Sequence, residues 1–90
     1  GLDELSSFKE LTLYPNPVAS ELNVKFTTEM NQDVSINIYD ISGKSAQKQL
    51  IKAIEGSNLV LLNVENLSKG LYFVNISSGE SSETLQFVVK

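Results

Sequence analysis

Short runs in which apolar and polar residues alternate are the feature that most limits the folds open to this chain. In the clearest run, Val34, Ile36 and Ile38 alternate with polar residues, so their side chains would lie on one face of a β-strand. Similar runs recur between turn-forming residues, and helical periodicity is not convincing anywhere. We therefore expect an all-β fold, an Ig-like antiparallel β-sandwich of about seven short strands.

The run that follows Gly70 has a further feature. Tyr72, Val74 and Ile76 would share one face of a strand that begins directly after a turn. In antiparallel sandwiches this is the usual position of a tyrosine corner, in which the ring fills the core and the hydroxyl group bonds back to the backbone of the turn. We expect Tyr72 to have this structural role.

Three segments predict where the sheet edges lie. Pro15 and Pro17 follow the short run Leu11–Tyr14 and remove two backbone donors, which suits a brief strand or an edge strand. The polar segment Lys44–Ala53 carries three lysines, a common protection of edge strands. By contrast, Leu59–Val64 is apolar nearly throughout, which predicts a central strand or one that is buried on both faces.

Asp40 and Gly43 mark a hairpin turn between two of these strands. An aspartate side chain can accept hydrogen bonds within such a turn, and glycine readily adopts a positive φ. A calcium site would need a local run of oxygen ligands such as Asp-x-Asp, and the sequence has none. We therefore expect a structural turn and no metal site.

The length of 90 residues suits one small domain with a single core. Hydrophobic residues make up 41% of the chain, a share typical of folded domains and not of disordered chains. Residues 1–10 are polar with scattered apolar side chains. We interpret them as the end of a linker, followed by a domain of residues 11–90.

Several classes of function are disfavoured by what the sequence lacks. Cysteine and histidine are absent, which removes thiol nucleophiles, disulfides and the most common general base. The carboxylates lie in separate turns, without the spacing of an acid–base pair. The net charge of −4 disfavours nucleic acids and anionic membrane surfaces, and no segment is apolar enough to span a bilayer. We expect no enzyme, no catalytic residue and no cofactor, and we expect the partner to be a protein.

Four motifs follow one another along the predicted domain. They are Leu13-Tyr14-Pro15-Asn16-Pro17, the run Val34-x-Ile36-x-Ile38-Tyr39-Asp40-Ile41-Ser42-Gly43-Lys44, the segment Leu67-x-x-Gly70-x-Tyr72-x-Val74-x-Ile76, and Phe87-Val88-Val89-Lys90. In this order and at these distances they resemble the C-terminal sorting domain, type A, of proteins exported by the type IX secretion system of Bacteroidetes. Gln86 departs from the pattern, since family members often have a lysine just before the final apolar run.

The resemblance implies an address tag at the end of a larger cargo protein. Such domains are Ig-like sandwiches that pass through the periplasm and are recognised by type IX translocon and shuttle proteins at the outer membrane. A sortase-like cell-surface peptidase then usually removes them, and the cargo reaches the cell surface or the medium. The family motifs imply sorting-signal roles for Pro15, Pro17, Asp40, Gly43, Gly70, Tyr72, Phe87, Val88, Val89 and Lys90.

The binding mode and one competing function stay open. A receptor could bind the last strand by strand addition at an open sheet edge or by capture of its terminus, with exposed Leu71 and Phe73 adding apolar contacts. An open edge could also let two copies of the chain associate. The competing function is a non-catalytic, fibronectin type III-like accessory or binding module of a secreted multidomain protein. A sorting domain must come last in its protein, whereas an accessory module can occupy any position.

Overall fold

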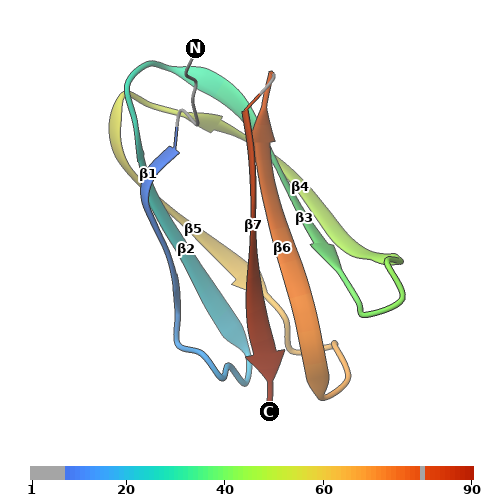
Figure 1. Cartoon of the computed structure of the whole chain (residues 1–90). Helices are drawn as coiled ribbons and strands as arrows, with labels where there is room; N and C mark the ends of the chain where they lie inside the picture. Colours follow the sequence, from blue (N-terminus) through green and yellow to red (C-terminus); the bar gives the residue numbers. More distant parts are fainter. Residues whose placement is uncertain (1–7, 80) are drawn as a thin grey trace.

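Two antiparallel β-sheets pack face to face in the computed structural model, which describes residues 8–79 and 81–90 (Figure 1). One sheet has three strands in the order β1-β2-β5, and the other has four in the order β4-β3-β6-β7. The predicted all-β sandwich of seven strands is confirmed. The strands are β1 (Phe8–Tyr14), β2 (Glu21–Thr28), β3 (Gln32–Tyr39), β4 (Ser45–Ala53), β5 (Gly56–Asn63), β6 (Gly70–Ser78) and β7 (Ser81–Val89).

The core lies between the sheets and follows from the alternation seen in the sequence. Burying an aliphatic side chain of the size found here stabilises the fold by about 1.5–3 kcal/mol. Both central strands of the four-stranded sheet, β3 and β6, contribute one full face to this core, as does β2 from the other sheet. The side chains concerned are Leu22, Val24 and Phe26 of β2, Val34, Ile36 and Ile38 of β3, and Tyr72, Val74 and Ile76 of β6.

β1 begins at Phe8, earlier than the predicted start at Leu11. Phe8 is buried, and its ring meets that of Phe26 edge to face, with ring centroids 5.5 Å apart. The pairing of β1 with β2 is irregular around Glu10, whose φ is +55°. This bulge breaks the alternation of buried side chains, and the strand predicted from that alternation therefore did not reach back to Phe8. The strand takes up the end of the predicted linker, whose other residues (1–7) lie outside the described part of the chain.

The prediction for the apolar segment Leu59–Val64 is wrong. Most of the segment belongs to β5, which is an edge strand of the three-stranded sheet and not a central one. Val60 and Leu62 point into the core, whereas Leu59 and Leu61 are 55% and 54% exposed. A run of apolar residues has the same composition whether one or both of its faces are buried, so composition could not place the strand.

The other edge predictions are confirmed. β1 and β4 both lie at sheet edges, as the prolines after β1 and the lysines of β4 predict. One side-chain bond links the two sheets where β4 passes the finish of β5: the Gln47 side chain donates a 2.8 Å hydrogen bond to the Asn63 carbonyl. β7 is the remaining edge strand.

The start of β1 and the finish of β7 lie at opposite ends of the sandwich (Figure 1). One end holds the finish of β7, the β1–β2 connection, the β3–β4 turn and the β5–β6 connection, and we call it the C-terminal end. The other end holds the start of β1, where Phe8 pairs with Thr28, and the turns β2–β3, β4–β5 and β6–β7. The start of β1 is therefore separated from the finish of β7 by the length of the sheets.

Candidate functional site

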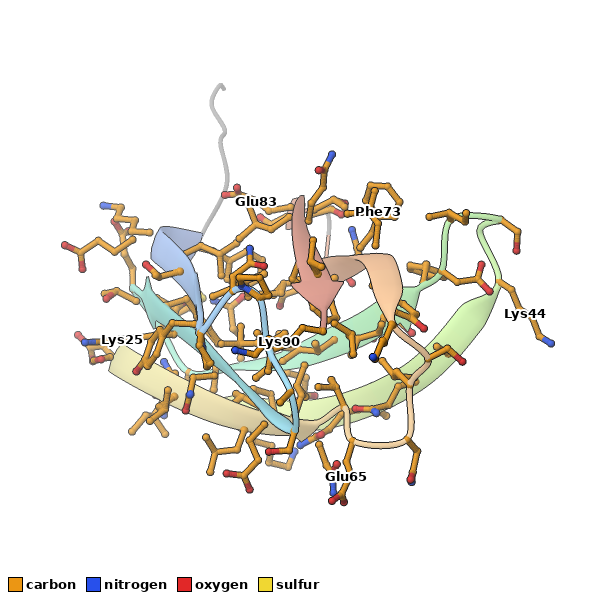
Figure 2. The ribbon with its side chains drawn as sticks, turned by 90° about the horizontal axis from the view of Figure 1, so that it is seen from below. Lys25, Lys44, Glu65, Phe73, Glu83 and Lys90 are labelled. Atoms are coloured by element: carbon orange, nitrogen blue, oxygen red, sulfur yellow. The ribbon has the colours of Figure 1, made fainter. Side chains whose placement is uncertain are left out.

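Each of the four predicted motifs reaches the C-terminal end of the sandwich, and three of them meet there. Figure 2 views this end, with Lys90 near its middle. The finish of β7 pairs with the start of β6 on one side and with the β1–β2 connection on the other. The turn at Asp40–Gly43 lies apart, because β6 separates β3 from β7. The structure therefore groups the proline motif, the Gly70-x-Tyr72 motif and the end motif around the last strand.

Tyr72 ties β6 to β7 through its ring and to the preceding loop through its hydroxyl group. The ring stacks on that of Phe87, with centroids 5.7 Å apart and ring planes 23° apart. The hydroxyl group donates a 2.7 Å hydrogen bond to the Ser68 carbonyl, which confirms the predicted tyrosine corner. Gly70 pairs with Val89 and has a φ of +147°, a conformation that residues with a side chain rarely adopt. Gly70 and Tyr72 thus stabilise the fold around the finish of β7.

The β1–β2 connection closes the outer edge of β7. The side-chain oxygen of Asn16 accepts a hydrogen bond from the Val88 amide at 3.0 Å. Val18 pairs in parallel with Val89: the Val18 amide donates to the Val88 carbonyl at 2.8 Å, and the Val18 carbonyl accepts from the Lys90 amide at 2.9 Å. We call residues 16–18 the clasp. Val18 is fully buried, whereas Asn16 is exposed.

Asn16 and Val18 are candidate site residues that were not among those predicted from the sequence. Pro15 and Pro17 are exposed and have no backbone N–H, so they cannot donate to a neighbouring strand. The amide side chain of Asn16 supplies both a donor and an acceptor, and its nitrogen also approaches the Gln86 carbonyl at 3.5 Å. The sequence signal that could have identified Asn16 is its position: its hydrogen-bonding side chain stands between two prolines that lack a backbone donor.

The end motif is divided between the core and the surface. Phe87 and Val89 are buried, whereas Val88 is 39% exposed and Lys90 is exposed. Leu71 of β6, which pairs with Val88, is 38% exposed. Alternate residues of the last strand therefore have different roles: two hold the strand in the core, and two face outward.

This arrangement corrects the expectation of an open edge at the end of β7. Strand addition needs free backbone groups on the side away from β6. At Val88 and Lys90 those groups are already bonded to the clasp. The side chains on the outer face stay accessible, namely Val88 beside Leu71, while Phe73 further along β6 is half-buried. The folded domain thus presents side chains at this position and not a strand edge.

Asp40 and Gly43 form the predicted hairpin turn between β3 and β4. The Asp40 carboxylate accepts hydrogen bonds from the Ser42 hydroxyl at 2.6 Å, the Ser42 amide at 2.9 Å and the Lys44 amide at 3.0 Å. These bonds, above all that from the Ser42 hydroxyl, hold the pKa of Asp40 below its ordinary value. Gly43 has a φ of +88°, which favours glycine. All of these contacts are local, so Asp40 and Gly43 shape the turn itself.

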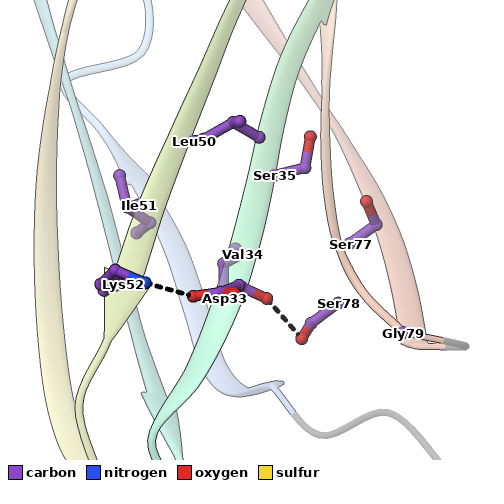
Figure 3. A pocket seen from close by; sticks show the side chains of 9 residues that line it. All are labelled: Asp33, Val34, Ser35, Leu50, Ile51, Lys52, Ser77, Ser78 and Gly79. Atoms are coloured by element: carbon purple, nitrogen blue, oxygen red, sulfur yellow. Dashed lines mark hydrogen bonds and ion pairs between the residues drawn. The ribbon is translucent and has the colours of Figure 1, made fainter.

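A cavity of about 480 Å³ lies on the outer side of β3, β4 and the end of β6 (Figure 3). Its charged groups pair with each other, since Lys52 lies 3.2 Å from Asp33. The Ser78 hydroxyl lies 2.6 Å from the Asp33 carbonyl. Val34, the first residue of the second motif, lines this cavity, whereas none of the residues with an implied sorting-signal role does, and we assign no ligand to it.

Within residues 8–79 and 81–90, no group of three or more His, Cys, Asp or Glu side chains is placed to hold a metal ion. The described residues also contain no helix long and apolar enough to cross a membrane. The expectations of no metal and no cofactor stay predictions.

A family model described as the secretion system C-terminal sorting domain matches residues 12–90. Among solved structures, the chain resembles part of a β-glucuronidase from Parabacteroides merdae, with a TM-score of 0.67 and 16% identity over 91% of this chain and 13% of that one. It also resembles part of a β-glucosidase from Bifidobacterium adolescentis, with a TM-score of 0.56 and 10% identity over 92% of this chain and 17% of that one. A β-glucosidase from Listeria innocua is similar in part, with a TM-score of 0.54 and 15% identity over 93% of this chain and 16% of that one. The chain spans less than a fifth of each enzyme, and identities this low show a shared fold alone. Comparison with curated proteins gives no match.

Proposed function

The chain belongs to the secretion system C-terminal sorting domain family, and we propose that it directs a cargo protein, fused before it, across the outer membrane through the type IX secretion system. The observation that carries the proposal is the meeting of three sequence motifs around the finish of β7. The clasp, the start of β6 and the end motif occupy one small region, although the bond from Asn16 to Val88 spans 72 residues of sequence.

The opposite placement of the two ends of the domain suits this role. A cargo fused before Phe8 would join the sandwich at the end where β1 begins. The exposed side chains of Val88 and Lys90 lie at the other end. The cargo therefore does not have to cover the surface that the secretion machinery binds.

Removal of the domain by a sortase-like peptidase at the cell surface fits the same arrangement. Phe8 is buried against Phe26, so a peptide bond inside β1 would have to leave the sheet before a protease could cleave it. Cleavage before Phe8 would release the cargo from a domain that stays folded. We place the cleavage there, after which the cargo is found on the cell surface or in the medium.

The proposed role involves proteins and no catalytic step of the domain's own. Sorting domains of this family are non-catalytic in general, and the sequence has no Cys or His. The partners in this proposal are translocon and shuttle proteins, the peptidase and the fused cargo. The net charge of −4 gives no support to a nucleic acid partner.

A fusion experiment in a Bacteroidetes strain with a working type IX system tests the proposal. A reporter that is delivered to the periplasm would carry the chain at its C-terminus or, as the matched control, at its N-terminus. We expect only the first fusion to reach the cell surface or the medium. Retention of both fusions in the periplasm would contradict the proposal, as would export of the first fusion in a strain that lacks the translocon.

The competing proposal is a fibronectin type III-like accessory module. It is favoured by the likeness of the whole chain to parts of three glycosidases. Such a module can work at any position in a secreted multidomain protein. Export that depends on the C-terminal position supports a sorting domain. An absence of export from either position, together with binding of the chain to a polysaccharide or to a neighbouring domain, supports the accessory module.

A further inference from the structure

We propose that Asn16 and Val18 are positioning residues of the sorting signal. The clasp that they form holds the finish of β7 as a closed strand, so that the secretion machinery binds outward side chains of the end motif and not the strand's edge. This inference rests on the proposed sorting function and adds to it a pair of residues and a mode of recognition.

The clasp occupies consecutive backbone groups on the outer side of β7. In β7 the backbone groups of alternate residues point toward β6 and away from it. The outward groups at the finish of the strand are the Val88 amide, the Val88 carbonyl and the Lys90 amide, and their bonds to the clasp measure 3.0, 2.8 and 2.9 Å. A strand added from outside would find these donors and acceptors already paired.

The two residues of the clasp differ in how they are held. Val18 is fully buried and belongs to the hydrophobic core, so it anchors the segment. Asn16 is exposed, and its side chain contacts backbone groups of β7. Replacement of Asn16 should therefore loosen the finish of β7 without opening the core.

The clasp also occupies the backbone groups through which the finish of β7 could pair with another chain. Open edges recruit strands from other molecules, and proteins block them with prolines or with covering segments. Here Pro15 and Pro17 flank Asn16 and offer no donors of their own. With the edge closed, the parts of the end motif left for recognition are the side chains of Val88 and Lys90.

A pair of matched variants tests the proposal. Asn16→Leu removes the amide at nearly constant size. Asn31→Leu is the control, because the exposed Asn31 side chain also accepts a bond from a backbone amide, that of Glu55 at 2.7 Å, at the opposite end of the sandwich. Amide hydrogen exchange of the full 90-residue chain and export of a reporter fused before it would be measured for both. Asn16→Asp, which keeps the acceptor for the Val88 amide, is the conservative variant.

We expect Asn16→Leu to speed exchange at the Val88 and Lys90 amides by about fivefold or more, the factor that one ordinary hydrogen bond contributes, and to lower export. Asn31→Leu should speed exchange at Glu55 alone and leave export unchanged. Asn16→Asp should restore slow exchange at Val88 and restore export.

Two outcomes would overturn the proposal: unchanged exchange at Val88 and Lys90 in Asn16→Leu, or faster exchange there with export equal to that of Asn31→Leu. If the unmodified chain fails to export the reporter, the sorting function itself fails. The exchange data then still decide whether Asn16 holds the strand.

Discussion

Asn16 and Val88 are separated by 72 residues of sequence and joined by a hydrogen bond of 3.0 Å. The bond links the first motif of the domain to its last, and the parallel pairing of Val18 with Val89 extends the link. In the folded chain the two motifs are therefore bonded to each other. In the proposed function, the sorting signal is therefore a folded region of the domain, and the last residues are one part of it.

Removal of the Tyr72 hydroxyl group should lower the stability of the domain without leaving a cavity in the core. We expect Tyr72→Phe to lose about 1 kcal/mol of unfolding free energy, because the bond to the Ser68 carbonyl is lost while the stack on Phe87 stays. Denaturant unfolding measures this. Tyr14→Phe serves as the control, since Tyr14 is 42% exposed and should change little. Equal effects of the two substitutions would contradict the tyrosine corner.

The Asp40 turn predicts a pH dependence of stability. The folded-state pKa of Asp40 is lowered by its bonds from Ser42 and Lys44, below an unfolded value of about 3.9. The stability that these bonds add is therefore complete above that value and is lost as pH falls through the folded pKa. We expect Asp40→Asn to melt below the wild type near neutral pH, and the two melting curves to converge on acidification. A difference that grows on acidification would contradict this.

A second carboxylate, Glu29, provides a comparison for Asp40, because the group that bonds Glu29 is a charged lysine. The pKa of Glu29 is also lowered, first by its hydrogen bond from Lys9 and then by the charge of that lysine, in an exposed ion pair of 2.6 Å. Salt screens exposed pairs of this kind. We expect any effect of Glu29→Gln on melting to fade in high salt, whereas that of Asp40→Asn persists. Equal salt sensitivity of both variants would count against hydrogen bonding as the cause at Asp40.

The fold could be predicted from the sequence because alternation and turn chemistry are local. The runs at Val34 and Tyr72 became the central strands β3 and β6, and Asp40 with Gly43 formed the expected turn. The errors arose where local pattern carries no information. An apolar run does not say whether its second face is covered, as at Leu59, and the bulge at Glu10 hid the true start of β1.

The candidate site could be predicted only in part. The sequence named the motifs that meet at the finish of β7 but did not divide the end motif into buried Val89 and exposed Val88. The bonds of Asn16 and Val18 to β7 could not be predicted, because they depend on how two distant segments meet. The closed edge at the finish of β7 therefore became visible only in the folded chain.

Neighbouring valines of the end motif should respond differently to truncation. Val89 is 3% exposed and belongs to the core, so we expect Val89→Ala to lower the unfolding free energy by about 2 kcal/mol. Val88 is 39% exposed, and Val88→Ala should change it by about 0.5 kcal/mol or less. Denaturant unfolding of both variants tests this. Similar losses would contradict the observed orientation of β7.

The exposed edge of β5 predicts weak self-association at high concentration. The Val64 amide bonds to the Ser20 carbonyl beside β2, so alternation directs the backbone groups of Leu59 and Leu61 outward. Two antiparallel copies could pair there and cover both exposed leucines. Sedimentation should show less association for Leu59→Lys than for the control Leu50→Lys, whose strand β4 already carries lysines. Equal association of the two variants would place the contact elsewhere.

A test of the central claim must leave the fold intact. Deletion of residues 87–90 does not, because Phe87 and Val89 are core residues. The double variant Val88→Ser with Lys90→Ser changes only exposed side chains of the end motif. Its matched control, Lys48→Ser with Leu50→Ser, changes an exposed lysine and an exposed apolar residue on β4 of the same sheet.

The most direct measurement is the fraction of a fused reporter that reaches the cell surface or the medium with each double variant, alongside the melting temperature of each isolated chain. We predict wild-type melting for both variants, wild-type export for the β4 control, and retention in the periplasm for the variant at Val88 and Lys90. Export of that variant at the wild-type level would contradict the claim that the end of β7 is the surface recognised in secretion.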